Sequence, residues 1–119
     1  MKITVSLKEN HLFRRLYQKG KTAADSRLAL YVRPNGRKGN RLGLTVSTKL
    51  GHAVVRNRTR RRLREIYRLH EEELICGRDV VIVARVRAAS STYQQLERSF
   101  LRLAEKLELL KKEKEAEEK

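Results

Sequence analysis

Residues 79–87 read DVVIVARVR, and this stretch decides the architecture of the chain. Its four consecutive apolar residues, Val80 to Val83, place apolar side chains on both faces of a strand, because successive side chains point to opposite faces. A run of this kind is typical of a strand at the centre of a sheet that is covered on both sides. We therefore predict a central strand here, with Gly77 breaking the chain just before it.

The segment after this strand has the pattern of an amphipathic helix that covers the sheet. Ser91 or Thr92 is a suitable N-cap, since a hydroxyl side chain can accept a hydrogen bond from a free backbone N–H group. The apolar positions recur at alternating intervals of three and four residues: Tyr93, Leu96, Phe100, Leu103, Leu107 and Leu110. A coiled-coil seam is the alternative use of such a stripe. We predict a domain over residues 1–110 and a frayed, charged tail over residues 111–119, which lack an apolar face.

Two strands with a period of two precede the central strand. Apolar residues alternate on one face of the first, over residues 27–33, and of the second, over residues 42–47. The loop between them is rich in glycine and asparagine, which favours a hairpin. If the two strands pair, Tyr31 stands above small residues on their outer face and forms one side of a shallow trough.

Helices are predicted at two further places. Ser6 followed by Glu9 resembles a capping box, and Gly20 lies where a glycine would end a helix, so a short helix is expected between them. Residues 53–74 form a second, highly charged helix. Its predicted buried stripe is Thr59, Leu63, Ile66, His70 and Leu74. The element order is then α-β-β-α-β-α, and the fold class is a single-domain, two-layer α+β sandwich.

The charge of the chain indicates a polyanion as its partner. The 119 residues carry 29 lysines and arginines against 14 acids, a net charge of +15. Residues 101–119 hold as many acids as bases, so the whole excess lies in residues 1–100, as is typical of nucleic-acid binding. No apolar run approaches the about 20 residues of a membrane span, and the single cysteine, Cys76, excludes an internal disulfide. We expect a cytoplasmic protein without membrane contact.

The densest basic segment is residues 56–68, which hold seven arginines and one acid, Glu65. The helical positions opposite the buried stripe are Asn57, Arg61, Arg64 and Arg68. Like charges so close repel one another, and phosphates would neutralise them, because each guanidinium offers a fork of donors that matches phosphate oxygens. A solvated face would alternate Glu with Lys, so we expect this helix to contact nucleic acid. Arg62 lies nearer the apolar edge, where packing of its stem is the alternative.

RNA is favoured over DNA as the partner. The arginine-rich helix is expected to be a half-buried crossover between two strands, whereas a DNA-reading helix enters the major groove. Single-stranded RNA is bound by backbone contacts and by stacking on aromatic rings, for which Phe13, Tyr17 and Tyr31 are available. Core packing is the alternative role of each ring. The sequence contains no acid cluster, nucleophile–base arrangement or metal-ligand spacing, so no catalytic or metal-binding side chain is predicted.

Several motifs occur in a specific order along the chain. They are residues 42–47 (LGLTVS), Lys49, Gly51, residues 53–58 (AVVRNR), Arg60, Arg61 and residues 63–65 (LRE). Phe13, Tyr17, Gly20, Leu30, Tyr31 and residues 79–85 extend the pattern. This order closely resembles the bacterial ribonuclease P protein family, over roughly residues 8–105.

The resemblance implies a fold, a partner and a set of contacts. The fold would be of the ribosomal protein S5 domain 2-like type, with an uncommon left-handed β-α-β crossover. The catalyst would be an RNA subunit that cleaves precursor tRNA with Mg²⁺ bound mainly by that RNA. Residues implied to bind the RNA subunit are Arg56, Asn57, Arg58, Arg60, Arg61 and Arg64, to which the helical pattern adds Arg68. Residues implied to bind the 5′ leader are Phe13, Tyr17, Tyr31, Ser47 and Lys49, to which we add Arg14 because this base flanks the aromatic residues in the sequence.

Two other functions are compatible with a small basic domain. A ribosomal protein would be equally basic, but it would co-sediment with ribosomal particles. A protein nuclease would cleave RNA by itself, and no acid cluster supports it. We therefore expect an RNA-binding subunit of ribonuclease P, which matures tRNA 5′ ends, with the catalytic RNA and precursor tRNA as partners and no DNA.

Overall fold

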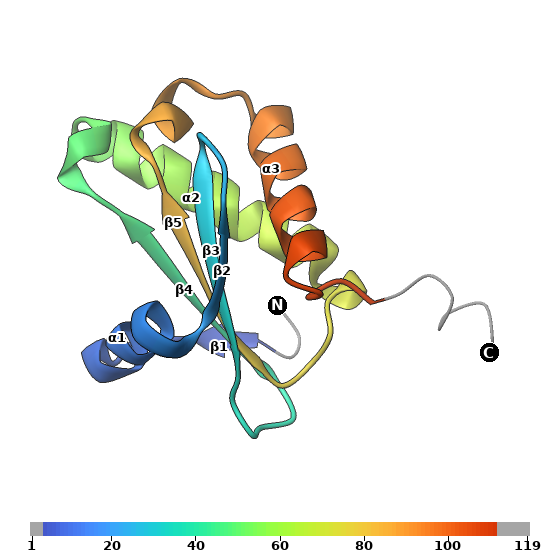
Figure 1. The fold of residues 1–119 in the computed structure, drawn as a ribbon. Helices are drawn as coiled ribbons and strands as arrows, with labels where there is room; N and C mark the ends of the chain where they lie inside the picture. Colours follow the sequence, from blue (N-terminus) through green and yellow to red (C-terminus); the bar gives the residue numbers. More distant parts are fainter. Residues whose placement is uncertain (1–3, 112–119) are drawn as a thin grey trace.

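A five-stranded mixed sheet is the central element of the computed structural model, which describes residues 4–111 (Figure 1). In chain order the elements are β1 (Thr4–Ser6), α1 (Asn10–Lys19), β2 (Lys21–Ala24), β3 (Leu28–Pro34), β4 (Asn40–Val46), η1 (Thr48–Leu50), α2 (Ala53–His70), η2 (Glu71–Glu73), β5 (Arg78–Ala84), η3 (Val86–Ser90) and α3 (Tyr93–Lys106). The strand order in the sheet is β1-β4-β5-β3-β2. The mixed α+β fold expected from the sequence is confirmed.

β5 is the central strand, as its apolar run predicts. Val80, Val81 and Ile82 are all 0% exposed. β3 pairs with β5 in antiparallel orientation on one side, and β4 pairs with it in parallel on the other. β3 and β4 are therefore not neighbours, and the predicted hairpin is wrong. The chain instead crosses through α2 and places β5 between them, where its apolar side chains contribute to the cores on both faces of the sheet.

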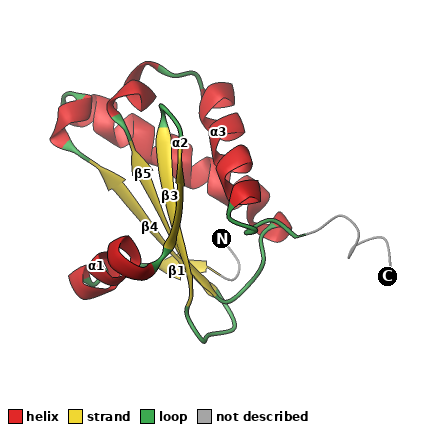
Figure 2. Ribbon diagram, viewed as in Figure 1, coloured by secondary structure: helices red, strands yellow, loops and turns green. Residues whose placement is uncertain are grey.

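The helices cover the two faces of the sheet unequally (Figure 2). α2 and α3 pack on one face, where Leu63, Ile66 and Phe100 join the larger core. α1 packs on the opposite face around Leu16 and Val81. The sandwich thus carries one short helix on its second face. None of the helices in residues 4–111 combines the length and apolar character needed to cross a membrane.

α3 begins at the predicted place. Thr92 is its N-cap: the Thr92 Oγ1 accepts a hydrogen bond from the Gln95 N–H at 3.1 Å. The Gln95 side chain in turn accepts one from the Thr92 N–H at 2.9 Å, which completes a capping box.

The C-terminal end of α3 comes earlier than the apolar stripe predicts. The helix ends at Lys106, and Leu110 lies beyond it in an antiparallel bridge with Leu74. The bridge brings the end of the domain back to the segment between α2 and β5. Apart from Lys111, the predicted tail lies outside the described residues.

The N-terminal part differs from the sequence prediction. Ser6 belongs to β1 and caps no helix, and α1 begins at Asn10, after Glu9. The missed strands β1 and β2 have only three and four residues, too few for an alternating pattern to stand out. Gly20 ends α1 as expected, but with an extended backbone. Glycine is needed there because a Cβ would lie 2.6 Å from the Leu16 carbonyl oxygen.

α2 packs against the sheet through four buried residues. They are Thr59, Leu63, Ile66 and Tyr67, of which the sequence prediction omitted the last. The Tyr67 Oη lies 3.0 Å from the Thr4 Oγ1 and 3.3 Å from the Asn40 Nδ2, so it fastens β1 and β4 to the helix. The helix ends at the half-buried His70, and Leu74 is buried beyond it rather than within it.

His70 connects the end of α2 to η2 and α3. The His70 Nδ1 lies 2.5 Å from the Glu73 Oε2, and the Nε2 lies 2.7 Å from the Glu97 Oε2. Burial by itself would lower the pKa of His70. The hydrogen bonds to the two carboxylates outweigh burial and hold the pKa of His70 above its usual value.

We expect the contribution of His70 to stability to fall with rising pH. Because its folded-state pKa is raised, the contribution is complete below the unfolded-state value of about 6.5 and is lost as the pH rises through the folded-state pKa. Urea unfolding at about pH 5.5 and about pH 9 should show a larger loss of stability in His70→Gln, relative to wild type, at the lower pH. His52→Gln, at an exposed position, is the control. A pH-independent difference would contradict the ion pairs.

Candidate nucleic-acid interface

α2 presents its arginines on the side away from the core, as predicted. The exposed side chains opposite the buried stripe are Asn57, Arg61, Arg64 and Arg68. The half-buried arginines at the flanks of this face are Arg56, Arg58, Arg60 and Arg62. We call the exposed and flanking residues together the arginine face.

Two arginines of α2 are bound within the protein. The Arg68 Nε donates to the Glu65 Oε2 at 3.0 Å and the Nη2 to the Oε1 at 2.5 Å. This hydrogen-bonded pair lowers the pKa of Glu65. The Arg62 Nη1 donates to the Ser91 carbonyl at 3.3 Å, so this side chain ties α2 to the segment before α3. Arg68 and Arg62 are therefore less available to a ligand than their neighbours.

Four other arginines of the face, Arg58, Arg60, Arg61 and Arg64, are more available to a ligand. The Arg60 Nη1 has a single 3.1 Å hydrogen bond to the Asn57 Oδ1. Within residues 4–111, no hydrogen bond or ion pair occupies the guanidinium of Arg58, Arg61 or Arg64. Among the described residues nothing compensates their positive charge, which suits a surface that binds phosphates.

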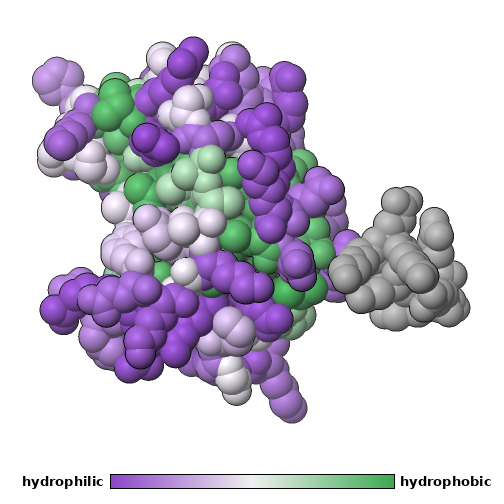
Figure 3. Space-filling model, viewed as in Figure 1, coloured by the Kyte–Doolittle hydropathy of each residue, from purple (hydrophilic) through white to green (hydrophobic). Residues whose placement is uncertain are grey.

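A groove of about 720 Å³ lies between α1 and α2, over β4. Its lining residues are Asn10, Phe13, Arg14, Tyr17, Leu44, Thr45, Val46 and Arg60. On the molecular surface it is a paler hollow between the hydrophilic surface of α1 and that around the start of α2 (Figure 3). The groove combines a largely apolar floor with cationic side chains on both walls, an arrangement that accommodates bases and phosphates together.

The groove exists because the sheet is incomplete at this point. β1 pairs with β4 only along residues 40–42, so the remaining part of β4, from Gly43 to Val46, lies at an edge of the sheet. α1 on one face and α2 on the other form walls on either side of this edge. A Cβ at Gly43 would lie 2.6 Å from the Phe13 Cζ, so glycine lets the Phe13 ring rest directly on the strand.

Tyr17 is the most exposed of the three predicted aromatic residues, with 41% of its surface accessible. Its hydroxyl lies 3.0 Å from the Thr45 Oγ1, across the floor of the groove. The ring centroid of Phe13 lies 6.4 Å from that of Tyr17, and the ring of Tyr31 meets Tyr17 edge-on at 4.9 Å. Tyr31 is half-buried and does not line the groove. The structure brings the three rings together, with Tyr31 supporting Tyr17 from the sheet.

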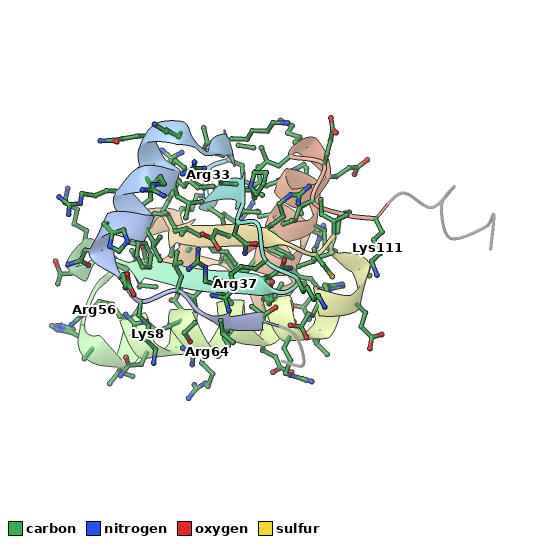
Figure 4. The ribbon with its side chains drawn as sticks, turned by 90° about the horizontal axis from the view of Figure 1, so that it is seen from below. Lys8, Arg33, Arg37, Arg56, Arg64 and Lys111 are labelled. Atoms are coloured by element: carbon green, nitrogen blue, oxygen red, sulfur yellow. The ribbon has the colours of Figure 1, made fainter. Side chains whose placement is uncertain are left out.

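A second cavity, of about 280 Å³, connects the groove to the arginine face. It shares Phe13, Leu44 and Arg60 with the groove and is also lined by Lys8 and Arg64. Lys8 and Arg64 lie on the same side of the molecule in Figure 4. Sequence reasoning missed Lys8 because it lies outside any motif, and only the pairing of β1 with β4 brings it beside α2.

Ser47 and Lys49 lie at the end of the groove rather than in it. Both are exposed residues that follow β4, and neither lines the groove. The Ser47 Oγ instead accepts a hydrogen bond from the Lys49 N–H at 3.1 Å and caps η1. Arg14, by contrast, is part of the wall formed by α1.

Comparison with known proteins shows the family of the chain. The family model described as ribonuclease P matches residues 1–108. The chain belongs to the ribonuclease P protein family. The ribonuclease P protein component of Natranaerobius thermophilus is 41% identical over 108 residues, which cover 91% of this chain and 94% of the relative. That of Caldanaerobacter subterraneus is 43% identical over 103 residues, covering 87% and 89%.

Solved structures of ribonuclease P proteins have the same fold. The Staphylococcus aureus protein superposes with a TM-score of 0.82 at 31% identity, over 89% of this chain and 97% of the other. The Thermotoga maritima protein gives 0.75 at 26% identity, over 82% and 92%. As a ribonuclease P protein, the chain is a component of the endoribonuclease that processes the 5′ ends of tRNA.

Proposed function

We propose that this ribonuclease P protein binds the catalytic RNA subunit through the arginine face and the 5′ leader of precursor tRNA through the groove. The observation that supports this most directly is the continuity of the two surfaces. Arg60 lines both the groove and the adjoining cavity, which is also lined by Lys8 and Arg64. A leader strand in the groove would therefore adjoin RNA bound along α2.

The two surfaces differ in the contacts they offer to RNA. The groove presents the exposed ring of Tyr17 for stacking against a base, with Arg14 and Arg60 beside it for phosphates. The arginine face presents the guanidiniums of Arg61 and Arg64, which are unpaired within residues 4–111 and match the geometry of phosphate oxygens on a structured RNA. The groove is thus suited to a single strand, and the face to the backbone of a folded RNA.

We assign cleavage of the phosphodiester bond to the RNA subunit, with the Mg²⁺ that this RNA holds. The side chains along the groove and α2 are mainly cationic, aromatic and apolar, whereas Mg²⁺ requires oxygen ligands. Among the described residues, no group of three acidic, histidine or cysteine side chains is placed to hold a metal ion. The arginines would replace condensed cations around the RNA and so lower the concentration of free Mg²⁺ that the enzyme needs.

Cleavage of a precursor tRNA at low Mg²⁺ tests the proposed function. We expect the protein alone to leave the precursor intact and the RNA subunit alone to cut slowly. The mixture should cut rapidly at the mature 5′ end, because protein arginines take over charge neutralisation from Mg²⁺. Gel analysis of the products over time measures all three reactions.

Each alternative function predicts a different outcome of this assay. Cleavage by the protein alone would indicate a protein nuclease. Absence of stimulation, together with co-sedimentation of the chain with ribosomal particles, would indicate a ribosomal protein. Either result would overturn the proposed role.

A further inference from the structure

A separate basic cavity lies on the other flank of α1. It has a volume of about 160 Å³, and the polar side chains that line it are Arg15, Arg33, Asn35, Arg41 and Asp79. α1 contributes Phe13, Arg14 and Tyr17 to the groove but Leu12, Arg15 and Leu16 to this cavity. The helix therefore separates the two sites, and one nucleotide cannot fill both.

Arg33, Asp79 and Arg41 form a row across three neighbouring strands, β3, β5 and β4. The Arg41 Nε and Nη2 donate to the two Asp79 carboxylate oxygens at 2.7 and 2.8 Å. The Asn35 Nδ2 also donates to Asp79, at 3.0 Å. The buried Asp79 is thus neutralised by Arg41, and this pair belongs to the fold.

Arg15 and Arg33 have no acidic partner among the residues that the structure describes. Across residues 4–111, neither guanidinium takes part in a hydrogen bond or an ion pair. Arg33 is half-buried on β3, and Arg15 projects from α1 into the same cavity. Two uncompensated positive charges at one cavity repel each other, and an anion bound between them would remove that repulsion.

We propose that Arg15 and Arg33 bind a phosphate group of RNA on the flank of α1 opposite the groove. The cavity has room for one phosphate and a few water molecules, given that a water molecule takes up about 30 Å³ of liquid. Arg33 also lines a neighbouring cavity of about 370 Å³, whose other charged lining residues are Lys19, Lys21, Arg78 and one acid, Glu108. The RNA backbone can therefore continue along mainly basic side chains.

This site lies apart from the arginine face. In Figure 4, Arg33 lies on the opposite side of the molecule from Arg56 and Arg64. The inference rests on the proposed function, because it gives the same RNA-binding protein a further contact. The RNA subunit and the precursor tRNA both present phosphates, and the experiment below distinguishes them.

The first measurement detects the site directly. Arginine Nε–Hε signals in NMR spectra of the full chain are followed while inorganic phosphate is added. We expect the signals of Arg15 and Arg33 to shift together with one dissociation constant, and that of Arg98, on the exposed side of α3, to stay in place. Absence of any shift for both arginines would overturn the site.

The second measurement asks which RNA supplies the phosphate. The double variant Arg15→Ala/Arg33→Ala is compared with Arg87→Ala/Arg98→Ala, which removes the same charge from exposed positions on η3 and α3. Binding is measured over a range of salt concentrations to the RNA subunit alone, to precursor tRNA with a long leader and to leaderless tRNA.

With the RNA that supplies the phosphate, we expect Arg15→Ala/Arg33→Ala to bind about tenfold more weakly than wild type. The slope of log affinity against log salt concentration should also become shallower by about one. Loss with the RNA subunit alone assigns the phosphate to that RNA, and loss with the precursor alone assigns it to the substrate. Arg15→Lys/Arg33→Lys should recover part of the affinity, because it keeps the charge without the fork.

The inference and the proposed function can fail separately. If the wild-type protein stimulates cleavage while the Arg15/Arg33 variant binds like the Arg87/Arg98 control in every arm, the additional site is overturned and the proposed function stands. If the wild-type protein gives no stimulation, the proposed function is overturned, and the phosphate titration still decides whether the site binds an anion.

Discussion

Replacement of Arg61 and Arg64 together by alanine is expected to weaken binding to the RNA subunit about hundredfold. Both side chains are exposed and unpaired within the described residues, so each can bind phosphate oxygens by charge-assisted hydrogen bonds. Such bonds contribute about 1.5 kcal/mol or more each, and about 1.4 kcal/mol corresponds to a factor of ten. Filter binding at several salt concentrations measures the affinity. The slope of log affinity against log salt concentration should become shallower by about two.

Arg68→Ala provides a matched comparison on the same helix. It removes the same charge as Arg64→Ala, but Arg68 is already bound by Glu65 through two hydrogen bonds. We therefore expect a smaller loss of affinity from Arg68→Ala than from Arg64→Ala. Equal losses would show that the Glu65 pair opens on binding, and wild-type affinity of the Arg61/Arg64 variant would contradict the arginine face.

Thermal unfolding separates a loss of binding from a loss of folding. Arg61 and Arg64 are exposed, and each adds a like charge to a crowded helix face. Their removal should leave the melting temperature of the free protein unchanged or raise it slightly. If the variant had a clearly lower melting temperature than wild type, its weak binding would be due to misfolding rather than to lost phosphate contacts.

The sequence was most informative where the pattern of a single segment was enough to predict its burial. The doubly apolar run from Val80 to Val83 requires cover on both faces, and β5 is indeed central. Its neighbours could not be derived in the same way, because pairing depends on how the crossover through α2 returns the chain to the sheet. Short β1 carries no periodic signal, yet its pairing with β4 determines where the sheet edge opens.

The sequence predicted which residues of α2 are exposed, but not how the side chains of the candidate site are arranged relative to one another. The exposed stripe Asn57, Arg61, Arg64 and Arg68 follows from helical periodicity and is confirmed as a surface. Periodicity could not show that Arg68 is paired with Glu65, because a side-chain ion pair depends on rotamers. Nor could it place Lys8 in the cavity that Arg64 also lines, since the two residues belong to segments far apart in the chain.

Tyr17→Ala is expected to reduce the affinity gained from a 5′ leader by about tenfold. Tyr17 is the exposed ring of the groove, and stacking of one base on an aromatic side chain contributes about 1–3 kcal/mol. The measurement compares the affinities of the reconstituted enzyme for precursor tRNA with a long leader and for leaderless tRNA. Only the former should weaken, because only it places a base in the groove.

Two further variants test whether the ring itself is responsible. Tyr17→Phe keeps the ring and removes the hydroxyl that lies 3.0 Å from the Thr45 Oγ1, so it should retain most of the leader affinity. Tyr31→Ala removes the edge-on support of the Tyr17 ring and should give an intermediate loss, since Tyr31 does not itself line the groove. Equal weakening of leaderless tRNA by Tyr17→Ala would show that the groove holds some other part of the RNA. If Tyr17→Phe lost as much leader affinity as Tyr17→Ala, stacking on the ring would not be the source of that affinity. The hydrogen bond between the Tyr17 and Thr45 hydroxyls would be the source instead.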